Sequence, residues 1–216
     1  MPHRELWTKR GDPLAPDQCT VDKVVGEMLV TEDRDDRVMV FIDLANALMA
    51  IQPKESTGLR LDFYRLVKEL VGPRRLMGAY VFDAIQSTDR SVDVPKRRLL
   101  DALRYLGFRV VVREVSFTEG EQKEVDIALA TEMLANAFRD AYDVAILVSG
   151  DRDFVPAVER IRAEGRRVEV AFFSGGSPLE QGRSFSHHLQ KVADRVHELD
   201  ALPILQVVGL RPEVGP

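Results

Sequence analysis

The stretch YDVAILVSGDRDFVPAV at residues 142–158 decides how this chain is interpreted. Its apolar run at 142–149 is typical of a strand buried inside a parallel sheet. The run ends on Ser149; Asp151 and Asp153 come just after it, and a segment with helical spacing follows. In open parallel sheets, ligands bind beyond the carboxyl ends of the strands. The stretch therefore predicts a strand–helix unit that carries part of a functional site.

The same alternation of short apolar runs and helical periods extends outward in both directions. Strands are predicted at 38–43, 76–83, 108–115, 142–149 and 166–173, with a last one at 203–208. Helices are predicted at 61–71, 94–107, 124–140, 153–165 and 184–193. Strands that alternate with helices indicate parallel βαβ units and a doubly wound α/β sheet.

The chain divides into three regions by composition. Residues 1–37 are polar and predict an N-terminal arm, partly disordered or packed on the domain, with one helical stretch at 21–30. Residues 38–200 hold the alternating pattern and predict the domain itself. Residues 201–216 predict a C-terminal tail. The oligomeric state stays open, including a homodimer or a protein partner held through the arm.

Composition excludes several classes of protein. No apolar run reaches the roughly 18 residues that a transmembrane helix needs. A single cysteine, Cys19, cannot form an internal disulfide, which favours a reducing, cytoplasmic setting. The four histidines show no spacing typical of a zinc site. The net charge of −5 argues only weakly against a nucleic-acid partner, since the arm 1–37 holds nine acidic and six basic residues.

Acidic residues gather at the predicted carboxyl edge. Asp43 ends the first strand and leads to Asn46, while Asp126 lies on the apolar side of a predicted helix. A carboxylate on an apolar face is costly unless it is paired, hydrogen-bonded or bound to metal. Clustered carboxylates repel each other, and a hard cation removes that cost. Oxygen ligands without cysteine or clustered histidine favour Mg²⁺ or Mn²⁺.

Each acid also has an ordinary structural explanation. Asp153 fits the N-cap of the following helix, and Asp43 fits a turn at a strand end. Asp126 is spaced to pair with Lys123, and Asp83 fits a loop start after the second strand. Together these explanations need several independent coincidences at one edge of the sheet, which favours the metal site.

Three motifs resemble those of a known family. They are D-L-A-N at 43–46, K-E-V-D at 123–126 and S-G-D-R-D-F-V-P at 149–156. They are similar to motifs of the NYN domain, specifically its LabA-like branch, within the PIN-like nucleases. The resemblance covers residues 38–199, including A-D-R-V-H-E-L at 193–199. It implies a three-layer α/β/α fold with a mainly parallel central sheet, PIN-like or Rossmann-like, and cleavage of RNA with Mg²⁺ or Mn²⁺.

The resemblance also implies roles for individual residues. The implied metal ligands are Asp43, Asp126 and Asp151, with Asp153 as a further ligand or an outer acid, and with Asn46 and Ser149 orienting the ligands or the attacking water. The family often has glycine and an acidic residue where this chain has Leu44 and Ala45. That departure affects substrate fit more than metal binding.

Several cations are candidates for RNA binding. Lys96, Arg97 and Arg98 form a basic run that fits phosphate contacts, although a solvated helix face also explains it. Lys123 lies beside the K-E-V-D acid, and Arg152 stands between two site aspartates. Arg152 fits a phosphate clamp or a simple balance of charge.

This chain lacks residues that two other classes of enzyme require. A dinucleotide-binding enzyme needs G-x-G-x-x-G after the first strand, where this chain has D-L-A-N-A-L. A phosphatase of the haloacid dehalogenase type needs a second acid where Ala45 stands. The function predicted from the sequence is a metal-dependent ribonuclease with an RNA substrate. The alternative is a catalytically weak PIN-like module that binds RNA or protein.

Overall fold

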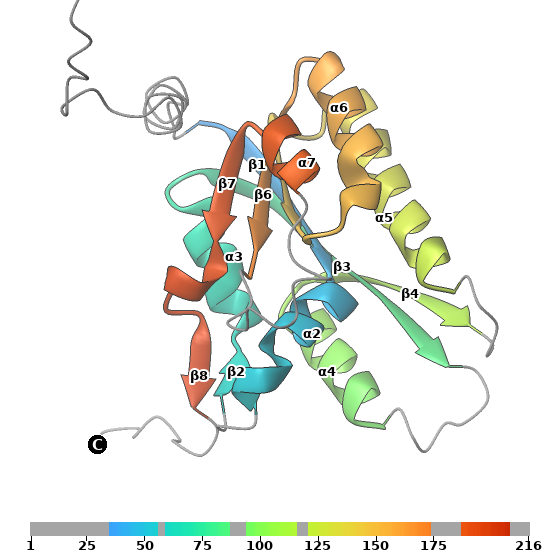
Figure 1. Ribbon diagram of the computed structural model, residues 1–216, viewed down its shortest axis with the longest axis vertical. Coiled ribbons are helices and arrows are strands. Elements are labelled where there is room, and N and C mark those ends of the chain that lie inside the picture. Colours follow the sequence, from blue (N-terminus) through green and yellow to red (C-terminus); the bar gives the residue numbers. More distant parts are fainter. Residues whose placement is uncertain (1–34, 56–58, 87–93, 116–120, 174–186, 208–216) are drawn as a thin grey trace, which may run out of the picture. The chain divides into compact units, whose positions relative to one another are not determined.

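The computed structural model describes residues 35–55, 59–86, 94–115, 121–173 and 187–207 (Figure 1). Most of the expected arm, including its helical stretch at 21–30, and the end of the expected tail lie outside these ranges. The strands are β1 (Arg37–Asp43), β2 (Leu59–Leu61), β3 (Arg75–Gln86), β4 (Arg109–Val115), β5 (Val144–Val148), β6 (Arg167–Phe172), β7 (Arg195–Glu198) and β8 (Leu205–Val207). The α-helices are α2 (Leu44–Glu55), α3 (Phe63–Val71), α4 (Val94–Tyr105), α5 (Glu121–Phe138), α6 (Val155–Ala163) and α7 (His187–Val192).

Six parallel strands form the central sheet, in the order β4-β3-β1-β5-β6-β7. β1 lies in the middle and pairs with β3 on one side and with β5 on the other. The chain order reverses around β1, so the loops after β1 and β5 leave the sheet next to each other. This is the place where open α/β sheets bind their ligands.

Helices cover both faces of the sheet, as Figure 1 shows. Alternate residues of a strand point to opposite faces. Val40 therefore joins the core cluster that includes residues of α2, α3 and α4, while Phe41 joins the cluster of α5, α6 and α7. The predicted three-layer α/β/α fold with a mainly parallel sheet is confirmed.

Some elements differ from the prediction. The second predicted strand, 76–83, continues to Gln86 as β3, so the expectation that Asp83 starts a loop is wrong. The helix α2 follows β1 without a break, and β7 forms the polar edge of the sheet; neither was predicted. The expected strand at 203–208 is present as β8, which pairs antiparallel with the short β2 in a separate sheet.

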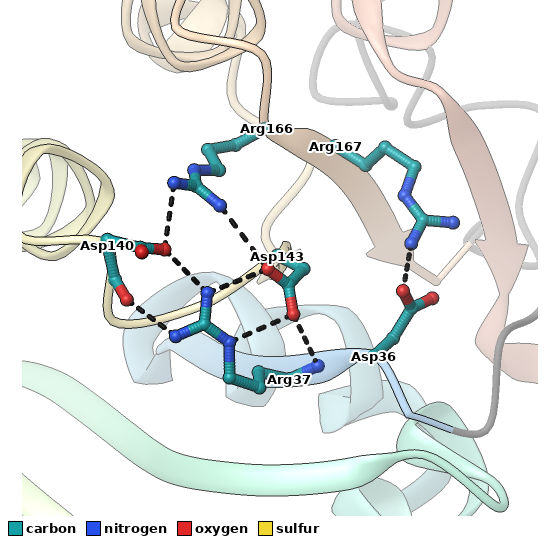
Figure 2. A network of polar contacts seen from close by, with 6 residues as sticks. All are labelled: Asp36, Arg37, Asp140, Asp143, Arg166 and Arg167. Atoms are coloured by element: carbon teal, nitrogen blue, oxygen red, sulfur yellow. Dashed lines mark hydrogen bonds and ion pairs between the residues drawn. The ribbon is translucent and has the colours of Figure 1, made fainter.

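Charged residues tie the amino ends of three neighbouring strands together (Figure 2). The Arg37 guanidinium binds Asp143, with Nε to Oδ2 at 3.0 Å and Nη2 to Oδ1 at 2.8 Å, and it also binds Asp140. Arg166 Nη2 lies 2.8 Å from Asp140 Oδ1, and Arg166 Nη1 lies 3.3 Å from Asp143 Oδ1. The hydrogen bonds from Arg37 lower the pKa of Asp143 to about 2. This network lies at the edge of the sheet opposite to the strand carboxyl ends.

Among the helices that the structure describes, none is both long and apolar enough to cross a membrane.

Candidate metal-binding active site

The candidate site forms where β1 and β5 end side by side. Ile42 pairs with Val148 in the parallel register, so the residues that follow, Asp43 and Ser149, leave the sheet at the same level. Both side chains are nearly inaccessible, at 3% and 1% exposure. Two motifs separated by about a hundred residues are thus brought into contact by one strand pairing.

Asp43 is held by hydrogen bonds on both carboxylate oxygens. Its Oδ1 accepts from the backbone N–H of Asn46 at 3.0 Å, at the start of α2. Its Oδ2 accepts from the Ser149 hydroxyl at 3.2 Å. Burial nevertheless raises the pKa of Asp43, and the negative charges of Asp151 and Asp83 add to that rise. Asp43 therefore makes the local hydrogen bond expected of a residue at a strand end, and it is also a buried acid whose negative charge is unfavourable.

Asn46 and Ser149 shape the loop after β5. The Asn46 side-chain oxygen accepts from the backbone N–H of Gly150 at 3.1 Å. The Ser149 hydroxyl oxygen accepts from the backbone N–H of Asp151 at 3.2 Å, while donating to Asp43. These bonds hold the backbone of the loop that carries Asp151, and Ser149 also holds the Asp43 carboxylate.

The next two aspartates have different surroundings. The Asp151 side chain accepts from the Asp153 backbone N–H at 2.9 Å and caps the short 3-10 helix Arg152–Phe154. The helix α6 begins after Phe154 and has no side-chain cap, so the capping explanation applied to Asp153 is wrong. The Asp153 side chain is 63% exposed, with Arg152 Nε 4.0 Å from its Oδ1.

Asp126 approaches the site from the first half of α5. Its helix buries Met133 and Ala137 against the sheet, on the apolar side where the spacing placed Asp126. Burial, and after it the charges of Asp43, Asp151 and Asp153 in that order, together raise the pKa of Asp126 to about 7. Four acids from three segments therefore share one electrostatic environment.

Asp83 is a fifth acid that the sequence assigned to a loop. It is 1% exposed inside β3, next to Phe82, which pairs with Asp43. Lys96 Nζ lies 3.1 Å from its Oδ1 and donates to the Ala84 carbonyl at 2.9 Å. Lys96 lies in the first turn of α4, and no spacing along the sequence links it to Asp83, so the sequence did not signal this pair.

Comparison with known proteins identifies the family and agrees with the fold. The NYN domain profile matches residues 37–200. The chain belongs to the NYN domain family. The crystal structure of a protein of unknown function from Vibrio parahaemolyticus is similar to it, with a TM-score of 0.60 and 23% identity. The similarity covers 80% of this chain and 98% of that one and supports the fold alone. No curated protein matches the chain.

The NYN domain belongs to the PIN-like nuclease superfamily, whose members generally use divalent metal ions. Within the described part of this chain, no group of three or more His, Cys, Asp or Glu side chains is arranged to hold an ion. The donor chemistry nevertheless fits, because Mg²⁺ is usually bound by one or two carboxylates and keeps several waters. Among the described groups that shift the pKa of Asp43 and Asp126, none is positively charged.

The predicted RNA-binding cations of this NYN domain have separate environments. Lys96 is engaged by Asp83, Arg97 is half-buried and Arg98 is exposed. The Arg152 side chain is 80% exposed beside Asp153. The side chain of Lys123 lies outside the described residues. The basic run is therefore neither a uniform phosphate patch nor a uniform solvated face.

Proposed function

We propose that this NYN domain is a metal-dependent ribonuclease that hydrolyses phosphodiester bonds of RNA. The observation that carries the proposal is the convergence of Asp43, Asp126, Asp151 and Asp153 on one edge of the sheet, where burial and then the charges of the other three acids raise the pKa of Asp126 to about 7. Acids that crowd without a partner are costly to the fold. Acids with raised pKa values at the carboxyl ends of the strands favour a role that uses their charge.

In this proposal, Asp43, Asp126 and Asp151 hold Mg²⁺ or Mn²⁺, with Asp153 as a further ligand or an outer acid. The bound ion would activate water and balance the charge of the scissile phosphate. Ser149 and Asn46 keep Asp43 and the Gly150 loop in place through the bonds described above. Arg152, which is exposed between two of the acids, would contact a phosphate of the RNA.

A second function is favoured by one observation. The described acids do not form a ready-made cluster for an ion, which fits a catalytically weak PIN-like module that binds RNA or a protein. Membership of the LabA-like branch, the RNA partner and the cytoplasmic setting remain predictions of the sequence.

A cleavage assay on labelled single-stranded RNA tests the enzyme against the binding module. Wild type is expected to cleave with Mn²⁺ and to stop in EDTA, and Asp151→Asn should lose most of the activity. Glu159→Gln is the matched control, because it removes one negative charge from an exposed position of α6. Equal activity of wild type and Asp151→Asn, or metal-independent cleavage, would contradict the proposal.

A further inference from the structure

A pocket lies between α4 and the paired strands β3 and β4, beside the candidate site. Its volume is about 260 Å³. It is lined by Ile85, Arg97, Leu100, Asp101, Arg104 and Val112. Ile85 and Leu100 are buried core residues and Val112 is half-buried, so the pocket has an aliphatic floor. The remaining three residues place charged groups around that floor.

Arg97, which lines this pocket, carries a hydrogen-bond donor with no acceptor among the described residues. Its Nε atom is buried, and no described group accepts a hydrogen bond from it. Buried donors are nearly always satisfied in folded proteins, and leaving one unpaired is costly. A ligand in the pocket that drew the Arg97 side chain toward itself and presented an acceptor to Nε would remove this cost. The other arginine of the pocket is already engaged, since Arg104 Nη1 lies 2.8 Å from Asp101 Oδ1.

The charge pattern of the pocket distinguishes between the parts of a nucleotide. A phosphate only accepts hydrogen bonds, so it could pair with Arg97 but would offer no donor to the Asp101 carboxylate. The edge of a nucleobase carries both acceptors and donors, which suit Arg97 and Asp101 together. A base also has an apolar face that packs on aliphatic side chains and on a guanidinium plane. The pocket therefore fits a base better than a phosphate.

The position of the pocket relates it to the acids. Val112 pairs with Asp83 across the β3–β4 register. Ile85 is two residues beyond Asp83 on the same face of β3 and so lies roughly 7 Å further along the strand. Asp83 in turn acts electrostatically on Asp43. An RNA strand that passes the acids can thus reach the pocket with a neighbouring nucleotide.

We propose that this pocket is a base-binding subsite, in which Arg97 receives an unpaired nucleobase of single-stranded RNA. The inference rests on the proposed function in that it assumes the same RNA ligand. It assigns the three neighbouring cations different tasks: Lys96 holds Asp83, Arg97 contacts a base, and the exposed Arg98 meets phosphates at most.

Equilibrium binding in EDTA tests the subsite without cleavage. The probes are a labelled single-stranded oligoribonucleotide and an abasic oligomer with the same number of phosphates. Arg97→Gln should weaken binding of the base-bearing RNA about tenfold, while binding of the abasic oligomer changes less than about twofold. Arg98→Gln is the matched control, since it removes the same charge from the next residue. It should affect both probes by the same factor.

Each outcome decides the inference. If Arg97→Gln weakens both probes equally, Arg97 is a phosphate contact and the subsite is excluded; no loss on either probe also excludes it. Arg97→Lys keeps the charge but loses the planar guanidinium, and it should resemble Arg97→Gln on the base-bearing RNA. Base-dependent binding without Mn²⁺-dependent cleavage would support the subsite and overturn the ribonuclease. Cleavage without base-dependent binding would do the reverse, and a wild type that binds no RNA would overturn both.

Discussion

At the residue scale, Asp43 is the point from which the candidate site is built. Both of its oxygens are hydrogen-bonded and its side chain is buried, yet its pKa is raised. Hydrogen bonds to a carboxylate ordinarily lower its pKa. Here burial and the neighbouring acids outweigh them. Asp43 is thus fixed in position while its charge remains unfavourable, which is the state that a bound cation would relieve.

Asp126 should make the stability of the metal-free protein depend on pH. Its pKa is about 7 in the folded chain and about 3.9 in an unfolded one. The folded state therefore binds more protons between these values, and the free energy of unfolding should fall as pH rises from about 4 to 7. Asp126→Asn removes this loss, so the variant should gain stability over wild type at pH 8 but not at pH 4. Chemical denaturation in EDTA at both pH values measures the difference, and a pH-independent difference would contradict the assignment.

Asp151→Asn should separate metal binding from folding. The change removes one of the repelling charges, so the variant should be at least as stable as wild type in EDTA. A metal ion that binds only the folded state stabilises it by about 2.7 kcal/mol at one hundred times its Kd. The variant should gain less than this from Mn²⁺, because it has lost one of the proposed metal ligands. Asparagine keeps the oxygen that caps the 3-10 helix, so the loss of a cap does not confuse the result. Thermal melts with Mn²⁺ and with EDTA test this, and equal metal responses would mean that Asp151 is not a ligand.

At the scale of elements, β3 and α4 are joined by the Asp83–Lys96 pair. Asp83 is buried, and a third of the Lys96 side chain is exposed. Lys96→Met leaves a buried carboxylate with one fewer charged partner, which should cost about 1–3 kcal/mol of the free energy of unfolding. The double variant Asp83→Asn with Lys96→Met should recover much of this loss, because no buried charge then remains. Urea denaturation of the single and double variants measures the coupling, and additive losses would show that the pair does not interact.

At the scale of the whole molecule, a buried ionic cluster joins the residue before β3 to the strands β6 and β7. Arg74 binds Glu169 with both terminal nitrogens, at 2.5 Å and 3.0 Å, and His197 lies 2.8 Å from the same carboxylate. Burial alone would raise the pKa of Glu169, but the bonds from His197 and Arg74 outweigh it and lower the pKa to about 2. The stability gained from this ionised group is present above about pH 4.5 and is lost as pH falls through about 2.

Arg74→Met should therefore destabilise the fold without touching the candidate site. Removing one partner of a buried ion pair typically costs about 3–5 kcal/mol, and Arg74 also donates to the Leu70 and Val71 carbonyls. The midpoint of urea unfolding should fall, while the extra stability from saturating Mn²⁺ stays as in wild type. A reduced Mn²⁺ response in a variant that is still folded would show that the two ends of the sheet are coupled.

The local sequence by itself determined the alternation of strands and helices, the parallel sheet and the family. Apolar runs and helical periods are local patterns, and the D-L-A-N and S-G-D-R-D-F-V-P motifs carry their polar residues at the strand ends. Elements without a strong local pattern were missed. α2 continues from β1 with no break in apolar character, and β7 is a short edge strand of half-exposed residues.

Only the tertiary structure decided which partner each site residue has. The pairing of β1 with β5 joins Ser149 to Asp43, and the length of β3 carries Asp83 inside the sheet toward Lys96. It also divided the basic run, because the turn of α4 points neighbouring residues in different directions: Lys96 to an acid, Arg97 to a pocket and Arg98 to solvent. The physical reason is that burial, hydrogen bonding and charge coupling depend on distances in space between segments remote in the chain. Residue type and spacing along the sequence specify only the local part of those distances.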